Sequence, residues 1–365
     1  MSTTICLNMI VKNEAHVIRR CLDSVRPFID CWVIVDTGST DGTQDVIRAH
    51  FADIPGSLHE RPWQDFAHNR SEALELARAK ADYLLFIDAD EVLRAPEGYV
   101  RPALGADAYF LHTEYASSIY SRCALVSTRL AWRWVGVLHE YLTSTPEAAK
   151  EHLEWPRIVV SREGARARDP DTYRKDAALL ERASREEPDN ARYAFYLAQS
   201  WRDAGEPAKA LEAYRHRAAM PGWDEETWQT LYEIGRMSEQ IRAPVAEIQG
   251  AYLAAYQFRP RRAEPLYQLA RFHRERGEHA LAYLFARQAS VIPLPADILF
   301  VDTSVYSWRS LDELSVAASY TDALDEGQVA TRRLLAEGHL PASERPRVEA
   351  NLGFYAGAIA KRGGR

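Results

Sequence analysis

The second half of the chain repeats a pattern at a nearly constant interval, and this repetition narrows the folds available to it. Tyr196, Tyr232 and Tyr267 follow one another at intervals of 36 and 35 residues. The segments LAQSWRDAGEPAKALEAY and LARFHRERGEHALAYLFA align without gaps, so that Gly205 and Gly277 occupy equivalent positions 72 residues apart. Apolar residues recur there at helical spacing, which predicts about three stacked pairs of helices, with an ordinary helical bundle as the alternative.

The repeats also indicate where the chain divides. The middle copy lacks the turn glycine, and the segment after Pro293 departs from the pattern, so we expect that segment to cap the array. The polar segment REGARARDPD separates the repeats from what precedes them. We therefore predict a first domain of residues 1–165 and a helical repeat domain of residues 166–365.

Charge and composition exclude several classes of function. The 365 residues carry a formal net charge of −7, which argues against a dedicated nucleic-acid-binding protein, because such proteins present a basic face. No apolar run is long enough to span a membrane, and the first ten residues lack the charged region of a signal peptide. The four cysteines form no CxxC pair, which favours reduced thiols. These observations predict a cytoplasmic protein without a transmembrane segment.

The first part of the chain alternates apolar, strand-like runs with helical patterns. We expect strands at Ile5–Val11, Trp32–Asp36, Leu58–Glu60 and Tyr83–Asp88. Asn13 and Asp65 are candidate N-caps of the helices that follow the first and third of these strands. The alternation predicts a Rossmann-like α/β domain with a mostly parallel sheet covered on both faces. In such sheets, ligands bind at the carboxyl ends of the strands.

Acidic residues gather at this predicted edge. Asp36 ends the second strand within VDTGSTDGT, and Asp88-Ala89-Asp90 ends the fourth. A carboxylate at a strand end can accept an N–H from a base or bind a ribose hydroxyl. Neighbouring carboxylates can hold Mg²⁺ or Mn²⁺, which would bridge a diphosphate and neutralise its charge as it leaves. The structural alternatives are a tight turn after Asp36 and a helix N-cap at the acidic triplet.

Three further residues could take part in the same chemistry. Arg70, in WQDFAHNRSEAL, would lie in the first turns of a helix at this edge, and its planar guanidinium suits phosphate. His139 could complete the coordination of a cation, and Glu140 could act as a general base. Without other evidence, an arginine such as Arg70 is more often a surface residue than a phosphate ligand. A pair such as His139–Glu140 is likewise more often structural than functional.

Four segments in this order resemble the family 2 glycosyltransferases of GT-A fold: MIVKNEAHVIRRCLDSV, VIVDTGSTDGT, DFAHNRSEAL and YLLFIDADE. The resemblance covers residues 4 to about 142. A GVLHE segment followed by tetratricopeptide-like repeats is similar to a bacterial subgroup that includes peptide and protein glycosyltransferases of the bacteriocin S-glycosylating type. The expected architecture is a GT-A domain followed by an all-α tetratricopeptide-like repeat domain.

The resemblance implies a role for each candidate residue in binding the donor. Asp36 would contact the nucleobase, usually uracil, and Val11 would line the same pocket through its backbone. Arg70 matches an arginine near the base and diphosphate. Asp88 would face the ribose or a metal-bound water, with the backbone of Ala89 alongside.

The resemblance also implies which residues bind the metal ion and which residue acts as the base. Asp90 would bind Mn²⁺ or Mg²⁺ directly, His139 would be a further ligand, and Glu140 would deprotonate the acceptor. Two departures from the family pattern matter. Many members have an Asp-Asp pair where this chain has Asp36-Thr37, and many have a catalytic Glu-Asp pair that is absent from this sequence. Glu140 is therefore assigned by position, with Glu114 as a rival.

The implied reaction is an inverting transfer from a nucleoside-diphosphate sugar, with UDP as the nucleotide, to a protein or peptide acceptor held by the repeats. Lipopolysaccharide core and other surface-glycan glycosyltransferases share the MIVKNE start, which makes a glycan acceptor the alternative. A non-enzymatic tetratricopeptide scaffold with a degenerate nucleotide-binding domain is a further alternative, and self-association into a homodimer is open. The DTGS signature also occurs in aspartic proteases, but those need a second DTG and an all-β domain.

Overall fold

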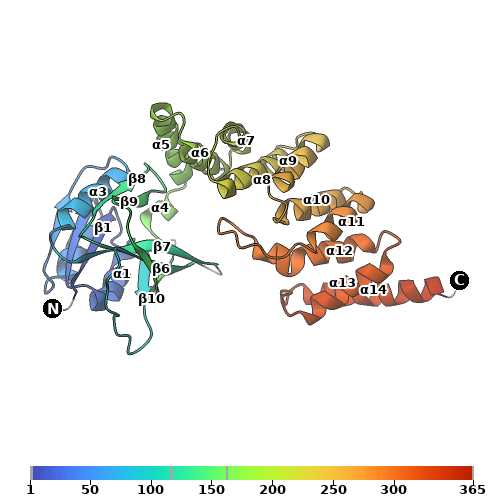
Figure 1. Ribbon diagram of the computed structural model, residues 1–365, viewed down its shortest axis with the longest axis horizontal. Helices are drawn as coiled ribbons and strands as arrows, with labels where there is room; N and C mark the ends of the chain where they lie inside the picture. Colours follow the sequence, from blue (N-terminus) through green and yellow to red (C-terminus); the bar gives the residue numbers. More distant parts are fainter. Residues whose placement is uncertain (1–2, 116–117, 162, 364–365) are drawn as a thin grey trace. The chain divides into compact units, whose positions relative to one another are not determined.

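The computed structural model describes residues 3–115, 118–161 and 163–363, and it divides into two compact units (Figure 1). The units comprise Met1–Glu186 and Glu187–Arg365. The predicted domain boundary after residue 165 falls at the start of the short helix α4 (Ala165–Arg168) and stays a prediction. In the part of the chain that is described, no helix has both the length and the apolar character needed to cross a membrane.

The first unit contains an eight-stranded sheet with the strand order β3-β2-β1-β4-β7-β6-β10-β5 and a separate ribbon, β8-β9. The strands are β1 (Ile5–Val11), β2 (Cys31–Asp36), β3 (Gly56–Glu60), β4 (Tyr83–Phe86), β5 (Glu91–Arg94), β6 (Ala108–Tyr115), β7 (Ser118–Ser127), β8 (Ala131–Val135), β9 (Tyr141–Thr145) and β10 (Lys150–Val160). The half from β3 to β4 is parallel, as the alternation predicts. The other half is mixed, because β7 pairs antiparallel with both β4 and β6.

Helices cover both faces of the parallel half, and each face has its own core. The helices of this unit are α1 (Ile18–Val25), η1 (Arg26–Phe28), α2 (Thr43–His50), α3 (Phe66–Ala77), α4 and α5 (Thr172–Glu186). Leu7 and Met9 of β1 pack with buried residues of α1 and α2. Cys6 points to the opposite face, where it packs with Leu74 of α3 and Trp132 of β8. Successive residues of β1 therefore serve two different cores, as expected for a strand buried on both faces.

The two predicted helix caps differ in outcome. Asp65 is the N-cap of α3, and its side chain accepts the N–H of His68 at 2.8 Å, which confirms that prediction. The prediction for Asn13 is wrong, because α1 begins only at Ile18. Asn13 instead adopts a left-handed conformation, with φ of 58°, and its side-chain oxygen accepts the N–H of Thr40. It thereby joins the loop after β1 to the loop after β2.

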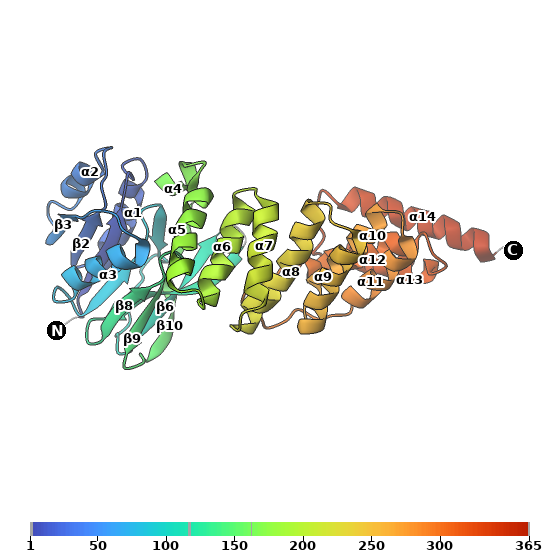
Figure 2. The same cartoon turned by 90° about the horizontal axis from the view of Figure 1, so that it is seen from above.

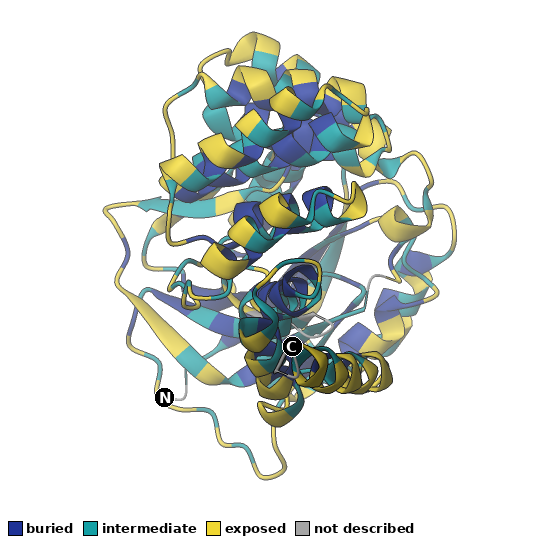
Figure 3. Cartoon of the chain, turned by 90° about the vertical axis from the view of Figure 1, so that its right-hand side faces the viewer, coloured by how far each residue is buried: buried dark blue, intermediate teal, exposed yellow. Residues whose placement is uncertain are grey.

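The second unit consists of helices, and Figure 2 shows consecutive hairpins lying side by side. They are α6 (Ala191–Asp203), α7 (Pro207–Ala218), α8 (Asp224–Gln240), α9 (Val245–Phe258), α10 (Glu264–Glu275), α11 (His279–Ala289), η2 (Val305–Arg309), α12 (Ser310–Ala318), α13 (Leu324–Ala336) and α14 (Arg345–Gly363). Buried and exposed residues alternate along them, as in stacked amphipathic helices (Figure 3). The segment after Pro293 does not simply end the array, since it leads into α12, α13 and α14.

The turns of the hairpins explain the repeating glycines. Gly205 ends the turn after α6 and Gly277 the turn after α10, with φ of 74° and 73°. A left-handed residue is required there, and glycine adopts this conformation without steric cost. In the middle copy the equivalent turn between α8 and α9 uses Arg242, with φ of 56°. The hairpin geometry is therefore kept where the sequence signal is lost.

Candidate active site

The strand order brings the predicted site residues to one edge of the sheet. β1 lies between β2 and β4, and all three strands run in parallel, so their carboxyl ends meet. Val11 and Asp36, the last residues of β1 and β2, are register partners. The Asp88-Ala89-Asp90 turn follows β4 on the other side of β1. This arrangement is the one in which open α/β sheets bind ligands.

Asp36 is almost fully buried, and its two carboxylate oxygens differ. Oδ1 accepts the N–H groups of Gly38 and Ser39 at 2.9 and 2.8 Å and the side-chain amide of Gln44 at 3.1 Å. Oδ2 is shielded from solvent and has no hydrogen-bond partner among the described residues. An unsatisfied buried acceptor is costly, so Oδ2 is suited to receive an N–H group from a bound molecule.

The loop after Asp36 also fixes Val11. Thr37 donates hydrogen bonds to the carbonyl oxygen of Val11 from its backbone N–H at 2.9 Å and from its hydroxyl at 3.1 Å. The Val11 carbonyl is therefore occupied by Thr37. Thr37, where many family members have a second aspartate, thus ties the ends of β1 and β2 together.

Arg70 lies in α3 and joins two acidic segments. Its Nη2 is 2.6 Å from Oδ1 of Asp88, and its Nε is 2.6 Å from Oε1 of Glu140. The guanidinium lies over the ring of Trp134, with 5.2 Å from Cζ to the ring centroid. Burial alone would raise the pKa of Asp88, but the charges of Arg70 and Arg122 outweigh it and lower that pKa below its ordinary value. Asp88 is therefore ionised at neutral pH.

Glu140 and His139 follow the ribbon strand β8. Gly136, with φ of 105°, and His139, with φ of 53°, turn the chain between β8 and β9. This turn directs Glu140 towards Arg70, whereas His139 is exposed. Glu114 lies on β6 and pairs with Arg157 at 3.2 Å and Arg94 at 3.6 Å, away from Arg70. The structure thus brings Glu140, Arg70 and Asp88 together and gives Glu114 different partners.

Two residues of this network do not stand out in the sequence. Glu91 is buried, its Oε2 accepts the backbone N–H of Asp88 at 2.9 Å, and it forms an ion pair with Arg122. Nη1 of Arg122 also lies 3.9 Å from Oδ2 of Asp88. Burial raises the pKa of Glu91, and Arg122 counteracts this. Glu91 adjoins the acidic triplet and could have been found, but Arg122 comes from β7, which carries no motif.

Asp90 contacts the segment that follows β10. Its Oδ2 accepts the backbone N–H of Gly164 at 3.2 Å. Burial and the charge of Asp88 raise its pKa above the ordinary value. Among the described residues, no three His, Cys, Asp or Glu side chains are grouped so that they could hold a metal ion. The carboxylates of this turn fit a cation that takes one or two carboxylate ligands from the protein. Such a cation completes its coordination shell with phosphate oxygens and water, as Mg²⁺ commonly does.

Comparisons with known proteins agree with this geometry. Residues 6–97 match the family model described as Glycosyl transferase family 2. The SPbeta prophage-derived glycosyltransferase SunS of Bacillus subtilis is 34% identical over 90 residues, which are 24% of this chain and 20% of SunS. The chain thus spans about a fifth of that relative. A TPR repeat-containing protein of Synechococcus elongatus is 27% identical over 327 residues, covering 78% of this chain and 74% of that protein.

Among solved structures, the crystal structure of MamA aligns with 46% of this chain and 88% of its own, at 15% identity and a TM-score of 0.37. The family model and the α/β sheet of the first unit identify that unit as a glycosyltransferase domain of GT-A type. The family 2 match lies within the first unit, at residues 6–97, so the family is assigned to that unit. The second unit consists of tetratricopeptide-like helical repeats. The predicted family and fold class are confirmed.

Proposed function

We propose that this protein is a metal-dependent, inverting glycosyltransferase that transfers a sugar from a UDP-sugar to a protein or peptide acceptor. The observation that carries the proposal is the unpartnered Oδ2 of Asp36, buried two strands away from the acidic turn. The N3–H of uracil would satisfy this oxygen. A nucleotide bound there would extend across the end of β1, past the backbone of Val11 and Ala89, and bring its diphosphate to Asp88, Asp90 and Arg70.

Asp90 would hold Mn²⁺ or Mg²⁺ together with the diphosphate, with His139 as a further ligand. When bound, the cation neutralises negative charge on the departing nucleotide. Asp88 would bind the ribose or a water molecule. Arg70 is pre-ordered by Asp88 and Glu140, so it can contribute a fixed positive charge to the same leaving group.

Glu140 would remove the proton from the acceptor nucleophile. In a single displacement, the nucleophile attacks the anomeric carbon as the bond to the diphosphate oxygen breaks, which inverts the configuration. Arg70 keeps the carboxylate of Glu140 in one position, 2.6 Å from its own Nε. A general base must reach the nucleophile of the acceptor, on the face of the sugar opposite the leaving group, so Glu140 would serve an acceptor that approaches from that face.

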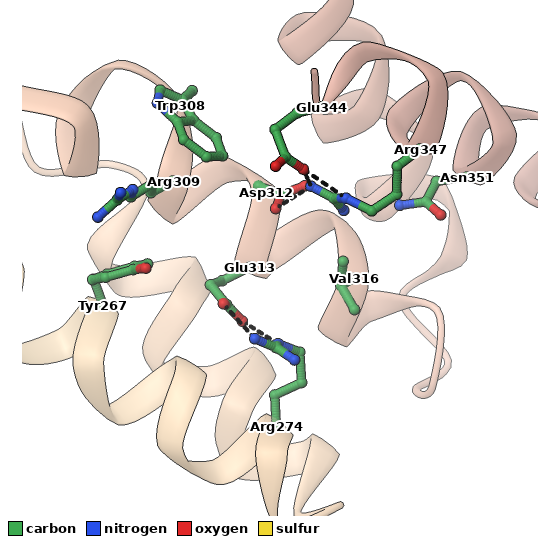
Figure 4. Close-up of a pocket in the computed structure, with 10 residues that line it drawn as sticks. All are labelled: Tyr267, Arg274, Trp308, Arg309, Asp312, Glu313, Val316, Glu344, Arg347 and Asn351. Atoms are coloured by element: carbon green, nitrogen blue, oxygen red, sulfur yellow. Dashed lines mark hydrogen bonds and ion pairs between the residues drawn. The ribbon is translucent and has the colours of Figure 1, made fainter. Parts of the chain in front are cut away.

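The second unit supports a macromolecular acceptor. It contains a pocket of about 590 Å³ between α10, α12 and α14, lined by Tyr267, Trp308, Arg309, Asp312 and Arg347 among others (Figure 4). Aromatic rings next to charged side chains are common in surfaces that bind peptides. A surface glycan is the second candidate acceptor. Location in the cytoplasm and the formation of a homodimer stay predictions.

The proposal is tested by thermal unfolding with UDP, GDP, CDP or dTDP, each with and without Mn²⁺. We expect UDP to stabilise the wild type only with Mn²⁺ and to lose this effect in Asp90→Ala. Stabilisation by another nucleotide would overturn the assignment of UDP. If no nucleotide stabilises a well-folded wild type, the scaffold alternative holds and the glycosyltransferase proposal fails.

A further inference from the structure

The chain that leaves the sheet after β10 returns to the acidic turn and binds it directly. We call Ser161 and Glu163–Ala165 the strap. The hydroxyl of Ser161 donates a hydrogen bond to the backbone carbonyl of Asp90 at 2.7 Å. The backbone N–H of Gly164 donates to Oδ2 of the Asp90 side chain at 3.2 Å. The strap thus holds both the backbone and the carboxylate of one residue.

The strap is itself anchored by the segment at the start of α1. Both carboxylate oxygens of Glu14 accept the N–H of Ala165, at 3.1 and 3.2 Å. His16 shares a hydrogen bond with the carbonyl of Glu163 at 2.8 Å, and Arg20 binds the Ser161 hydroxyl at 2.6 Å. These contacts link positions about 150 residues apart in the sequence, so the strap has a defined place next to Asp90.

The absence of a side chain at Gly164 lets the strap lie close to the Asp90 carboxylate. A Cβ atom at this position would lie 3.0 Å from Oδ2 and 3.1 Å from Cγ of Asp90. Its φ of −63° is accessible to any residue, so the backbone conformation does not require glycine. An alanine would therefore fit the local backbone and push against the Asp90 carboxylate.

We propose that Gly164 and Glu14 are positioning residues for Asp90. Gly164 binds Oδ2 of the Asp90 carboxylate and Glu14 anchors the strap, so that Oδ1 would be the oxygen offered to a cation bound with the donor. This inference rests on the proposed function, because it gives Asp90 the cation. Groups that orient a metal ligand without touching the metal typically change metal affinity or activity by 10–100-fold when altered.

The decisive comparison is between Gly164→Ala and Gly105→Ala. A Cβ at Gly105 has no atom of the described residues within 4 Å, so this variant controls for the gain of a methyl group in a loop. We would titrate Mn²⁺ against each protein at a fixed UDP concentration and follow free Mn²⁺ by electron paramagnetic resonance. Gly164→Ala is expected to weaken Mn²⁺ binding by roughly tenfold or more, and Gly105→Ala is expected to match the wild type.

Glu14 provides a second, independent comparison. Glu14→Ala removes the acceptor for the Ala165 N–H, and Glu14→Gln retains one, so glutamine should restore most of the Mn²⁺ affinity that alanine loses. In steady-state kinetics, Gly164→Ala and Glu14→Ala should raise the Mn²⁺ concentration for half-maximal rate more than they lower kcat.

Wild-type Mn²⁺ affinity in a folded Gly164→Ala would overturn the positioning role and leave the proposed function intact. A wild type that binds no Mn²⁺ with UDP would overturn both. If Gly164→Ala does not fold, Ser161→Ala, which removes the hydrogen bond to the Asp90 carbonyl, takes its place with the same expected direction.

Discussion

One guanidinium group, that of Arg70, lies 2.6 Å from a carboxylate oxygen of Asp88 and also 2.6 Å from one of Glu140. The two acidic residues are 52 positions apart in the chain and follow different strands. Arg70 therefore couples the part of the site that would bind the donor to the residue that would activate the acceptor. Substitutions at Arg70 and at Glu140 separate these two contributions.

Replacing Arg70 with lysine should cost far more than its conservative character suggests. A lysine ammonium is a single point charge and cannot contact both carboxylates in the geometry of the guanidinium. We expect kcat/KM for sugar transfer to fall by about 100-fold, or roughly 2.7 kcal/mol in transition-state free energy. Arg78→Lys, at an exposed pair with Glu75 in the next turns of the chain, should leave transfer unchanged. Equal rates for both variants would contradict the role of Arg70.

Glu140→Gln should separate chemistry from binding. Glutamine keeps the size of the side chain but cannot accept a proton, so kcat should fall by about 10²–10⁴-fold with little change in the KM of the donor. Glu114→Gln is the matched variant, since Glu114 pairs with Arg157 and Arg94 instead. If Glu114→Gln abolishes transfer and Glu140→Gln does not, then Glu114 is the base.

Asp36→Asn should change the choice of nucleotide. Oδ1 of Asp36 accepts three hydrogen bonds, so an asparagine would keep its oxygen there and place its NH₂ group at the position of Oδ2. That NH₂ group and the N3–H of uracil are both hydrogen-bond donors, so they cannot bind each other. The NH₂ group can donate to N3 of cytosine, which is an acceptor. We expect UDP binding to weaken by about 30-fold, or about 2 kcal/mol, and CDP to bind better than it does to the wild type. Unchanged UDP affinity would show that the base does not contact Asp36.

Glu14 should make stability depend on pH. Its burial raises its pKa to about 7 in the folded protein, against 4.5 for an ordinary glutamate; the Ala165 N–H opposes this and Asp90 adds to it. Between these values the folded state binds more protons than the unfolded state, so this contribution is fully present below pH 4.5 and is lost as the pH rises to about 7. Relative to the wild type, Glu14→Gln should therefore gain about 1–2 kcal/mol in unfolding free energy from pH 4.5 to pH 8. Urea unfolding at both pH values measures this difference, and a pH-independent difference would contradict it.

Replacing each of two glycines of the second unit with alanine should change the free energy of unfolding in opposite directions. Gly277 adopts a φ of 73°, so Gly277→Ala should lower the free energy of unfolding by about 1 kcal/mol through backbone strain. Gly250 lies exposed within α9, and a Cβ atom there would have no neighbour within 4 Å, so Gly250→Ala should raise it by about 0.5–1 kcal/mol. Thermal or denaturant unfolding distinguishes the two, and the same sign for both would contradict the assignment of the turn.

The residues that could be predicted from the sequence are those whose signals are local. The strand that ends in Asp36, the cap of α3 at Asp65 and the paired glycines all follow from patterns within a few residues. Asn13 shows the limit of that approach, because a residue type suited to helix capping is used instead to join two loops. Arg242 shows a second limit, because this turn residue adopts the left-handed conformation although it is not a glycine.

The residues that the sequence did not indicate are held by long-range contacts. Arg122 reaches the acidic turn only because β7 lies beside β4, and Gly164 reaches Asp90 only because the chain returns after β10. A sheet order of this kind, with later strands added on one side, has no short-range signature. The order also explains why the sequence suggested a parallel sheet, since only the strands before β5 alternate regularly with helices.

The position of β1 between β2 and β4 fixes the distance between the ends of those two strands. Asp36 and the acidic turn leave the sheet from strands on its two flanks, so two inter-strand spacings, together roughly 10 Å, set their separation. The ladder hydrogen bonds of β1 with β2 and with β4 maintain the interval between the strands from which the two segments leave. In the proposed binding mode, changes in loop length would vary what is attached to the nucleotide, while the strand spacing would set the length of the nucleotide that fits.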